Sequence, residues 1–311
     1  MITVEHLTKY YGEVLAVKDL SFEIREGGIC GFLGPNGAGK TTTMNILTGC
    51  LSPTSGTVKI CGYDILEEPK AAKRCVGYLP EQPPLYMNES PEEYLRFVGE
   101  VKGLRREALR SQIREVMERT GIADVSHRRL SDLSKGYRQR VGIAQALLGS
   151  PKVIILDEPT VGLDPLQIAQ IRDLIRDLGK THTVILSSHI LSEVQALCQK
   201  ILIISRGTLA AFDTPQALEA KSQARLRFRV EASREETEKV LRAMDGLGPW
   251  RLAEEAGATQ VTLDHSGGDS TARELFRAFA GAGRPIVEMT QAKASLEDIF
   301  LELTEKKEEK A

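Results

Sequence analysis

Two kinds of hydrophobic pattern alternate along the first 220 residues. Short, continuous apolar runs predict strands that are covered on both faces, and apolar residues three or four positions apart predict amphipathic helices. The expected strands are residues 2–7, 20–24, 28–33, 56–60, 76–79, 153–157, 183–187 and 201–205. The expected helices are residues 40–47, 91–101, 105–120, 135–148, 165–178 and 191–197. This alternation predicts an α/β fold whose central sheet is largely parallel.

Two segments depart from the alternation. Residues 84–150 are almost entirely helical, which predicts a helical insertion between two strand-rich blocks. Beyond residue 220, the order strand, helix, two strands, helix, strand and helix predicts a small split βαβ sandwich. We therefore expect two domains, residues 1–220 and an accessory α+β domain at residues 221–311.

The composition excludes several classes of protein. Of the 311 residues, 41% are hydrophobic and 27% are charged, which is ordinary for a globular chain. A net charge of −2 gives no bulk attraction to nucleic acid, so nucleic acid is not an expected partner. No apolar run approaches the ~18–20 residues that a membrane helix needs, and the N-terminus lacks the layout of a secretion signal. We expect a cytoplasmic protein that works at a membrane only through a partner.

A glycine-rich turn after the strand at 28–33 carries the strongest chemical signal. It matches G-x-x-x-x-G-K-[ST] between a strand and a helix, the context that a phosphate-binding loop requires. Glycines let backbone N–H groups converge on phosphates, and the helix directs its positive end toward them. Lys40 supplies a point charge to the β- and γ-phosphates, and Thr41 offers a hydroxyl to Mg²⁺. The expected nucleotide-binding residues here are Gly34, Pro35, Asn36, Gly37, Ala38, Gly39, Lys40, Thr41 and Thr42.

Two carboxylates end the apolar strand at 153–157. In parallel sheets, ligands lie beyond the carboxyl ends of the strands. We therefore expect Asp157 to hold Mg²⁺, directly or through water. Glu158 is expected to polarise the attacking water and so to act as a catalytic residue.

Further motifs follow in a fixed order. Residues 133–140 read LSKGYRQR, and DEPT at 157–160, GLDP at 162–165 and SSH at 187–189 come after them. In this order they resemble the ATP-binding cassette ATPases over residues 1–215, and LSKGYRQR looks like the family signature LSGGQ. The end of the chain is similar to the appendix on ATPase subunits of bacterial exporters with separate permeases. The signature variant resembles that of the gliding-motility subgroup.

The resemblance implies a P-loop NTPase core with an antiparallel β subdomain and a helical subdomain at residues 84–150. It also implies a homodimer that closes head to tail over two ATP molecules. Ser134 and Gly136, at the start of the signature helix, would then meet the γ-phosphate of ATP bound by the opposite subunit. Asp164 would lie across the dimer seam. His189 would contact the γ-phosphate and help to hold Glu158 and water in place.

For two roles, the resemblance leaves a choice between neighbouring residues. Tyr11 matches the aromatic residue that stacks on adenine, although its neighbour Tyr10 could do the same. The family's metal- and water-sensing glutamine aligns with Glu81, while Gln82 follows directly. We expect Gln82 to bind metal and nucleotide, with Glu81 as the alternative. The signature itself departs from the family at Lys135, which stands where the family has glycine.

The resemblance implies an ATPase that powers export by a separately encoded membrane permease, which would hold it at the inner face of the cell membrane. A non-transport cassette ATPase acting on ribosomes or nucleic acid is the alternative, although the chain carries one phosphate loop and no coiled-coil or zinc insertion. A scaffold that binds ATP without hydrolysis is a third interpretation. The complete set of Lys40, Asp157, Glu158 and His189 argues against it.

Overall fold

The computed structural model describes the chain except for residues 189, 222–224, 256–257, 265–268, 293–294 and 306–311. The chain divides into two compact units: Met1–Pro215 together with the residues from Leu303 onward, and Gln216–Glu302. Within the described residues, each helix is too short or too polar to cross a lipid bilayer.

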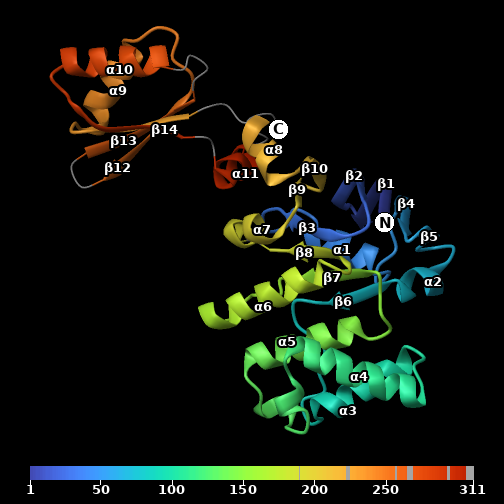
Figure 1. Cartoon of the computed structure of the whole chain (residues 1–311). Helices are drawn as coiled ribbons and strands as arrows, with labels where there is room; N and C mark the ends of the chain where they lie inside the picture. The colour runs from blue at the N-terminus through green and yellow to red at the C-terminus, as the bar shows by residue number, and fades with distance from the viewer. Residues whose placement is uncertain (189, 222–224, 256–257, 265–268, 293–294, 306–311) are drawn as a thin grey trace. The chain divides into compact units, whose positions relative to one another are not determined.

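A six-stranded sheet forms the centre of the first unit, with the strand order β10-β9-β3-β8-β7-β6 (Figure 1). Five strands run parallel, and β10 pairs antiparallel with β9. As predicted from their continuous apolar sequences, β7 and β8 are buried at every position. The bounds are β3 (Gly28–Leu33), β6 (Val76–Leu79), β7 (Val153–Asp157), β8 (Thr183–Ser187), β9 (Lys200–Ser205) and β10 (Thr208–Asp213).

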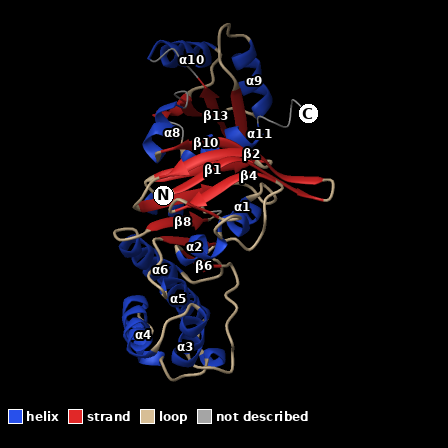
Figure 2. Cartoon of the chain, turned by 90° about the vertical axis from the view of Figure 1, so that its right-hand side faces the viewer, coloured by secondary structure: helices blue, strands red, loops and turns tan. Residues whose placement is uncertain are grey.

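A second sheet of the first unit is antiparallel, with the order β2-β1-β4-β5, and Figure 2 shows it beside the α/β core. Its strands are β1 (Ile2–Tyr11), β2 (Val14–Ile24), β4 (Ser55–Ile60) and β5 (Tyr63–Asp64). The first two are longer than predicted, because their pairing continues through exposed positions as far as Tyr11 opposite Val14.

Side chains cap three helices of the first unit, namely α3, α5 and α6. The capping box of Ser90 and Glu93 starts α3, and Asp164 caps α6 directly before Pro165. Four helices have the predicted bounds, namely α1 (Lys40–Leu47), α3 (Pro91–Val101), α6 (Pro165–Leu178) and α7 (Leu191–Leu197). A short helix of this unit, α2 (Pro69–Arg74), was not predicted, and neither was α8 (Pro215–Lys221), which begins at the boundary of the second unit.

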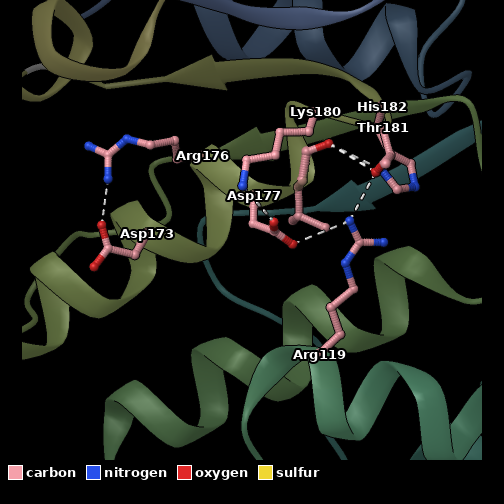
Figure 3. A network of polar contacts seen from close by, with 8 residues as sticks. Arg119, Asp173, Arg176, Asp177, Lys180, Thr181 and His182 are labelled. Carbon is pink, nitrogen blue, oxygen red and sulfur yellow. Dashed lines mark hydrogen bonds and ion pairs between the residues drawn. The ribbon is translucent and has the colours of Figure 1, made fainter.

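The predicted helical insertion consists of α3, α4 (Arg106–Thr120) and α5 (Lys135–Leu147), with two short 3-10 turns between α4 and α5. A polar network joins its α4 to the core (Figure 3). The Arg119 guanidinium donates a hydrogen bond to Thr181 Oγ1 at 2.9 Å and lies 3.7 Å from the Asp177 carboxylate at the end of α6. The last turn of α4 is thereby fixed to the turn between α6 and β8.

The far end of α5 is held by a lysine from the end of α3. Lys102 Nζ donates hydrogen bonds to the carbonyl oxygens of Gln145 at 2.9 Å, Ala146 at 3.4 Å and Leu148 at 2.8 Å. These carbonyls lack partners within the helix, so the ammonium satisfies them and complements the negative end of the helix dipole. Withdrawal of the ammonium from water lowers the pKa of Lys102 to about 8.

The second unit is an α+β fold with the strand order β12-β13-β11-β14, all antiparallel. Alternate residues of β11 and β13 form one apolar cluster with α9 and α10, in which the rings of Phe228 and Phe279 lie 5.5 Å apart. The order of elements is the one expected from the sequence. The bounds are β11 (Arg225–Val230), α9 (Arg234–Arg242), β12 (Trp250–Glu255), β13 (Ala258–Asp264), α10 (Asp269–Gly281), β14 (Ile286–Ala292) and α11 (Leu296–Glu305).

Candidate nucleotide-binding and catalytic site

The predicted phosphate-binding loop joins β3 to α1 and depends on its glycines. Gly37 and Gly39 have φ values of 76° and 101°, in the left-handed region that favours glycine. A Cβ atom at Gly39 would lie 2.6 Å from the carbonyl oxygen of Ala16, and one at Gly34 would lie 2.6 Å from that of Ile204. The loop is therefore packed closely between β2 and β9, where larger residues do not fit.

The tip of this loop faces solvent, and its end is buried. Pro35, Asn36 and Gly37 are exposed, whereas Ala38 and Gly39 are buried. The first turn of α1 follows, with Thr41 exposed and Thr42 half-buried. The free N–H groups of this helix start are therefore beside an accessible loop, an arrangement that suits an anion.

The Lys40 ammonium lies over the start of the loop. Its Nζ donates hydrogen bonds to the carbonyl oxygens of Gly34 at 2.6 Å and Pro35 at 3.1 Å. Burial lowers the pKa of Lys40, while the carboxylates of Glu158 and Asp157 act in the opposite direction. The structure thus brings the predicted loop lysine and the two predicted strand-end carboxylates into one electrostatic environment.

The two acidic residues lie at the end of β7, and a serine of β8 binds the Asp157 carboxylate and the Glu158 backbone. Asp157 is only 4% exposed, and its Oδ1 accepts a hydrogen bond from Ser187 Oγ at 2.5 Å. The same hydroxyl accepts a hydrogen bond from the backbone N–H of Glu158 at 2.9 Å. Ser187 stands opposite Asp157 in the parallel pairing of β7 with β8. Ser187 belongs to the SSH motif at 187–189, but the sequence pattern predicted no role for it.

Glu158 has an unusual backbone conformation. Its φ of 49° lies in the left-handed region, which costs a non-glycine residue roughly 1–2 kcal/mol. Such strain persists only where the surroundings hold it, and it is common at functional sites. The hydrogen bond to Ser187 is one such restraint on the predicted catalytic residue.

The oxygen atoms at this edge fit Mg²⁺ bound together with a nucleotide. Asp157 offers a carboxylate and Thr41 a hydroxyl, and Mg²⁺ prefers oxygen ligands. Among the residues that the structure describes, no group of three or more His, Cys, Asp or Glu side chains could hold a metal ion. Mg²⁺ is commonly held by one or two carboxylates and substrate phosphates, so these residues suit it without a complete protein cage.

The alternatives for the sensing residue follow β6. This strand pairs with β7 so that Leu79 stands opposite Leu156, and the chain therefore leaves β6 at the same edge as Asp157. Glu81 and Gln82 both come directly after this point and are exposed. The topology therefore brings both candidates to the carboxyl edge of the sheet.

The predicted adenine-stacking residue lies at the end of β1. Tyr11 and Tyr10 are both exposed, and Lys9 Nζ lies 5.4 Å from the centre of the Tyr11 ring. An exposed ring offers a face for stacking, so the structure leaves both tyrosines available. The other predicted catalytic residue, His189, lies outside the described residues.

The signature residues form a second group with Asp164. Ser134 caps α5, and its Oγ accepts a hydrogen bond from the N–H of Tyr137 at 3.3 Å. Asp164 caps α6 by accepting a hydrogen bond from the N–H of Gln167 at 2.9 Å. A Cβ at Gly136 would lie 2.7 Å from the side chain of that glutamine, so the two helix starts pack together.

Lys135 belongs to the same group. A side chain at Gly162 would collide with Lys135 Nζ, so this ammonium lies against the loop that precedes α6. Within the described part of the chain, no hydrogen bond or ion pair joins Ser134 or Asp164 to Lys40. The phosphate loop with its carboxylates and the signature with Asp164 thus form two groups of one chain, and Lys40 is not bonded to Ser134 or Asp164 among the described residues.

Comparisons with known proteins agree with this arrangement. The family model described as "ABC transporter" matches residues 17–161. The chain is 34% identical to the bacitracin transport ATP-binding protein BcrA of Bacillus licheniformis over 97% of both proteins. It is 40% identical to the uncharacterized ABC transporter ATP-binding protein YxlF of Bacillus subtilis, over 72% of this chain and 74% of that protein.

Solved structures show the same fold. A structure of an ATP-binding subunit of an ABC transporter has a TM-score of 0.65 and 29% identity, covering 71% of this chain and 92% of that chain. A dimeric post-hydrolysis state of the ATP-binding cassette MJ0796 with ADP and Pi has a TM-score of 0.62 and 26% identity, covering 69% and 98%. The expected α/β fold of a P-loop NTPase is therefore confirmed. The chain belongs to the ABC transporter ATP-binding proteins and is an ATPase of that family.

Proposed function

We propose that this chain is the ATPase subunit that powers export of a substrate by a separately encoded membrane permease. One observation carries the proposal: in the described chain Lys40 binds its own loop, whereas Ser134 and Asp164 bind only the starts of their own helices. Two copies packed head to tail would complete two sites, because each would present its signature to the loop of the other. Relatives named for bacitracin transport and linearmycin resistance support export as the direction.

In the proposed site, the loop from Gly34 to Thr42 holds the nucleotide phosphates and Lys40 offsets their charge. Mg²⁺, when bound, neutralises charge that develops on the phosphates. Thr41, Asp157 and Gln82 are the residues proposed to hold it. Tyr11 is proposed to stack on adenine.

Hydrolysis needs a water that is oriented toward the γ-phosphate. We assign this task to the Glu158 carboxylate, whose charge raises the pKa of Lys40 and which can accept a proton from that water. His189 is proposed to contact the γ-phosphate. From the opposite subunit, Ser134 and Gly136 would supply donors at the start of α5, and Asp164 would lie at the seam.

The helical insertion is proposed to transmit the motion to the permease, which would also place the chain at the inner face of the membrane. Exposed apolar side chains in this insertion support contact with a partner. Tyr86, Phe97 and Val101 are exposed, and the rings of Tyr86 and Phe97 lie 5.3 Å apart. Exposed apolar clusters of this kind mark interaction surfaces.

Glu158→Gln tests this function. We expect turnover to fall at least about 100-fold, since removal of a general base has an effect of that order. ATP binding should persist, and light scattering should detect a dimer with ATP and Mg²⁺. Intact hydrolysis would contradict the assigned role, and a persistent monomer would contradict the dimer. Purification with ribosomes and without a membrane protein would favour the non-transport alternative.

A further inference from the structure

A buried acidic side chain lies close to the proposed catalytic edge without belonging to it. Glu193 on α7 is only 5% exposed. Its Oε2 accepts a hydrogen bond from Thr160 Oγ1 at 2.8 Å and a longer one from Ser188 Oγ at 3.5 Å. Thr160 and Ser188 are also buried, and we call these three residues the Glu193 cluster.

Burial of this carboxylate is costly. A charged group taken out of water is unfavourable unless hydrogen bonds or an opposite charge compensate it. Within the described residues, no Lys, Arg or His forms an ion pair with Glu193, and its side-chain partners are the two hydroxyl groups. An apolar residue would serve packing better, so the carboxylate at this place indicates a role in positioning.

One arm of the cluster reaches the loop between β7 and α6. Thr160 lies two residues after Glu158, and its carbonyl oxygen accepts a hydrogen bond from the N–H of Leu163 at 3.2 Å. The N–H of Val161 donates to the carbonyl oxygen of Glu158 at 3.3 Å. Thr160 is therefore linked to the turns on both sides, and its hydroxyl anchors the loop to α7.

The other arm fixes the segment after β8. Ser188 Oγ accepts a hydrogen bond from the N–H of Ile190 at 3.0 Å, so its own proton is directed toward Glu193. The N–H of Glu193 in turn donates to the carbonyl oxygen of Ile190 at 3.2 Å. The start of α7 thus folds around the carboxylate. One side chain joins the two segments that follow β7 and β8.

We propose that Glu193 is a positioning residue for ATP hydrolysis. Through Thr160 it holds the loop that carries Glu158, and through Ser188 it holds the segment after β8. Glu193 thereby fixes the positions of these two segments relative to each other. The strained φ of 49° at Glu158 needs such support from its surroundings. The inference rests on the proposed role of Glu158, because positioning matters only if that residue acts on the water.

Two pairs of variants of the full-length chain test the inference. Thr160→Val removes the hydroxyl and keeps the shape, while Thr160→Ser keeps the hydroxyl. Glu193→Met removes the acceptor, while Glu193→Gln keeps an acceptor oxygen. We expect Thr160→Val and Glu193→Met to lower kcat for ATP hydrolysis at least about tenfold, with KM and the Kd of ATP changed less than about twofold. The serine and glutamine variants should stay within about threefold of wild type.

The double variant Thr160→Val with Glu193→Met should be no slower than the slower single variant, because both remove one interaction. Unchanged kcat in Thr160→Val and Glu193→Met would overturn the inference, and so would equal losses in the conservative variants. Glu158→Gln is the reference. If it hydrolyses ATP normally, the role proposed for Glu158 fails, and the positioning role that rests on it fails as well. If it is inactive while the Thr160 and Glu193 variants are fully active, only the positioning role fails.

Discussion

The two groups of the proposed nucleotide site are built differently. At the carboxyl edge of the sheet, Asp157 and Ser187 are buried, and a side-chain hydrogen bond joins them. At the starts of α5 and α6, Ser134 and Asp164 are exposed, and among the described residues each side chain makes only the hydrogen bond of a helix cap. The difference teaches that the carboxylates are held in place within one chain, whereas the signature residues are exposed, as the proposed contact with a second copy requires.

Ser187→Ala tests whether Ser187 holds the acidic residues at the end of β7 in place. The substitution removes hydrogen bonds to the Asp157 carboxylate and the Glu158 N–H, so we expect a loss of about 1–3 kcal/mol in the free energy of unfolding and at least about tenfold in kcat. Chemical denaturation and phosphate release measure the two effects.

Ser205→Ala is the matched control for that variant. Ser205 lies on β9 and is equally buried, but its hydroxyl has no hydrogen-bond partner among the described residues. Ser205→Ala should therefore hydrolyse ATP at the wild-type rate. If both serine variants behave alike, the order of the buried group does not depend on Ser187.

Lys102→Met tests how strongly Lys102 stabilises the end of α5, the helix that begins at the signature. The pKa of Lys102 in the folded chain is about 8, below the ordinary value of about 10.4 in the unfolded chain. Between these values the unfolded chain binds more protons, so the free energy of unfolding should rise with pH relative to Lys102→Met. Denaturation of both proteins from pH 7.5 to 10 measures this difference, and parallel pH profiles would contradict it.

Arg119→Ala removes the polar contacts that join α4 to the core and so tests how much they stabilise the protein. We expect the free energy of unfolding to fall by only about 0.5–1 kcal/mol, because the guanidinium that binds Thr181 and Asp177 is partly exposed. Arg176→Ala is the control, since Arg176 pairs with Asp173 within α6 and should change the stability less. If Arg119→Ala loses no more stability than Arg176→Ala, the link to α4 adds no stability beyond that of a surface pair within one helix.

Sequence patterns predicted the parts of the fold that local signals define. The bounds of α3 and α6 follow from Ser90 and Asp164, which cap helices that begin with proline. The strand β10 was missed because it is half-buried at every position and shows no alternation. The outer part of β1 was missed because its pairing with β2, rather than its own apolar residues, extends the strand.

The same distinction holds for the site. The phosphate loop and the carboxylates Asp157 and Glu158 are continuous motifs, so the sequence alone predicted them. The roles of Ser187 and Glu193 depend on residues about 30 positions away, which the pairing of β7 with β8 and the packing of α7 bring together. Such contacts leave no local pattern, and the structure was needed to find them.

Mixing two inactive variants tests most directly whether the site is shared between copies. Lys40→Met disables the phosphate loop, and Ser134→Ala disables the signature. A dimer of one of each would contain one site with an intact Lys40 and an intact Ser134. The account predicts that the mixture hydrolyses ATP faster than the sum of the two variants measured alone. A rate equal to that sum at every mixing ratio would contradict it.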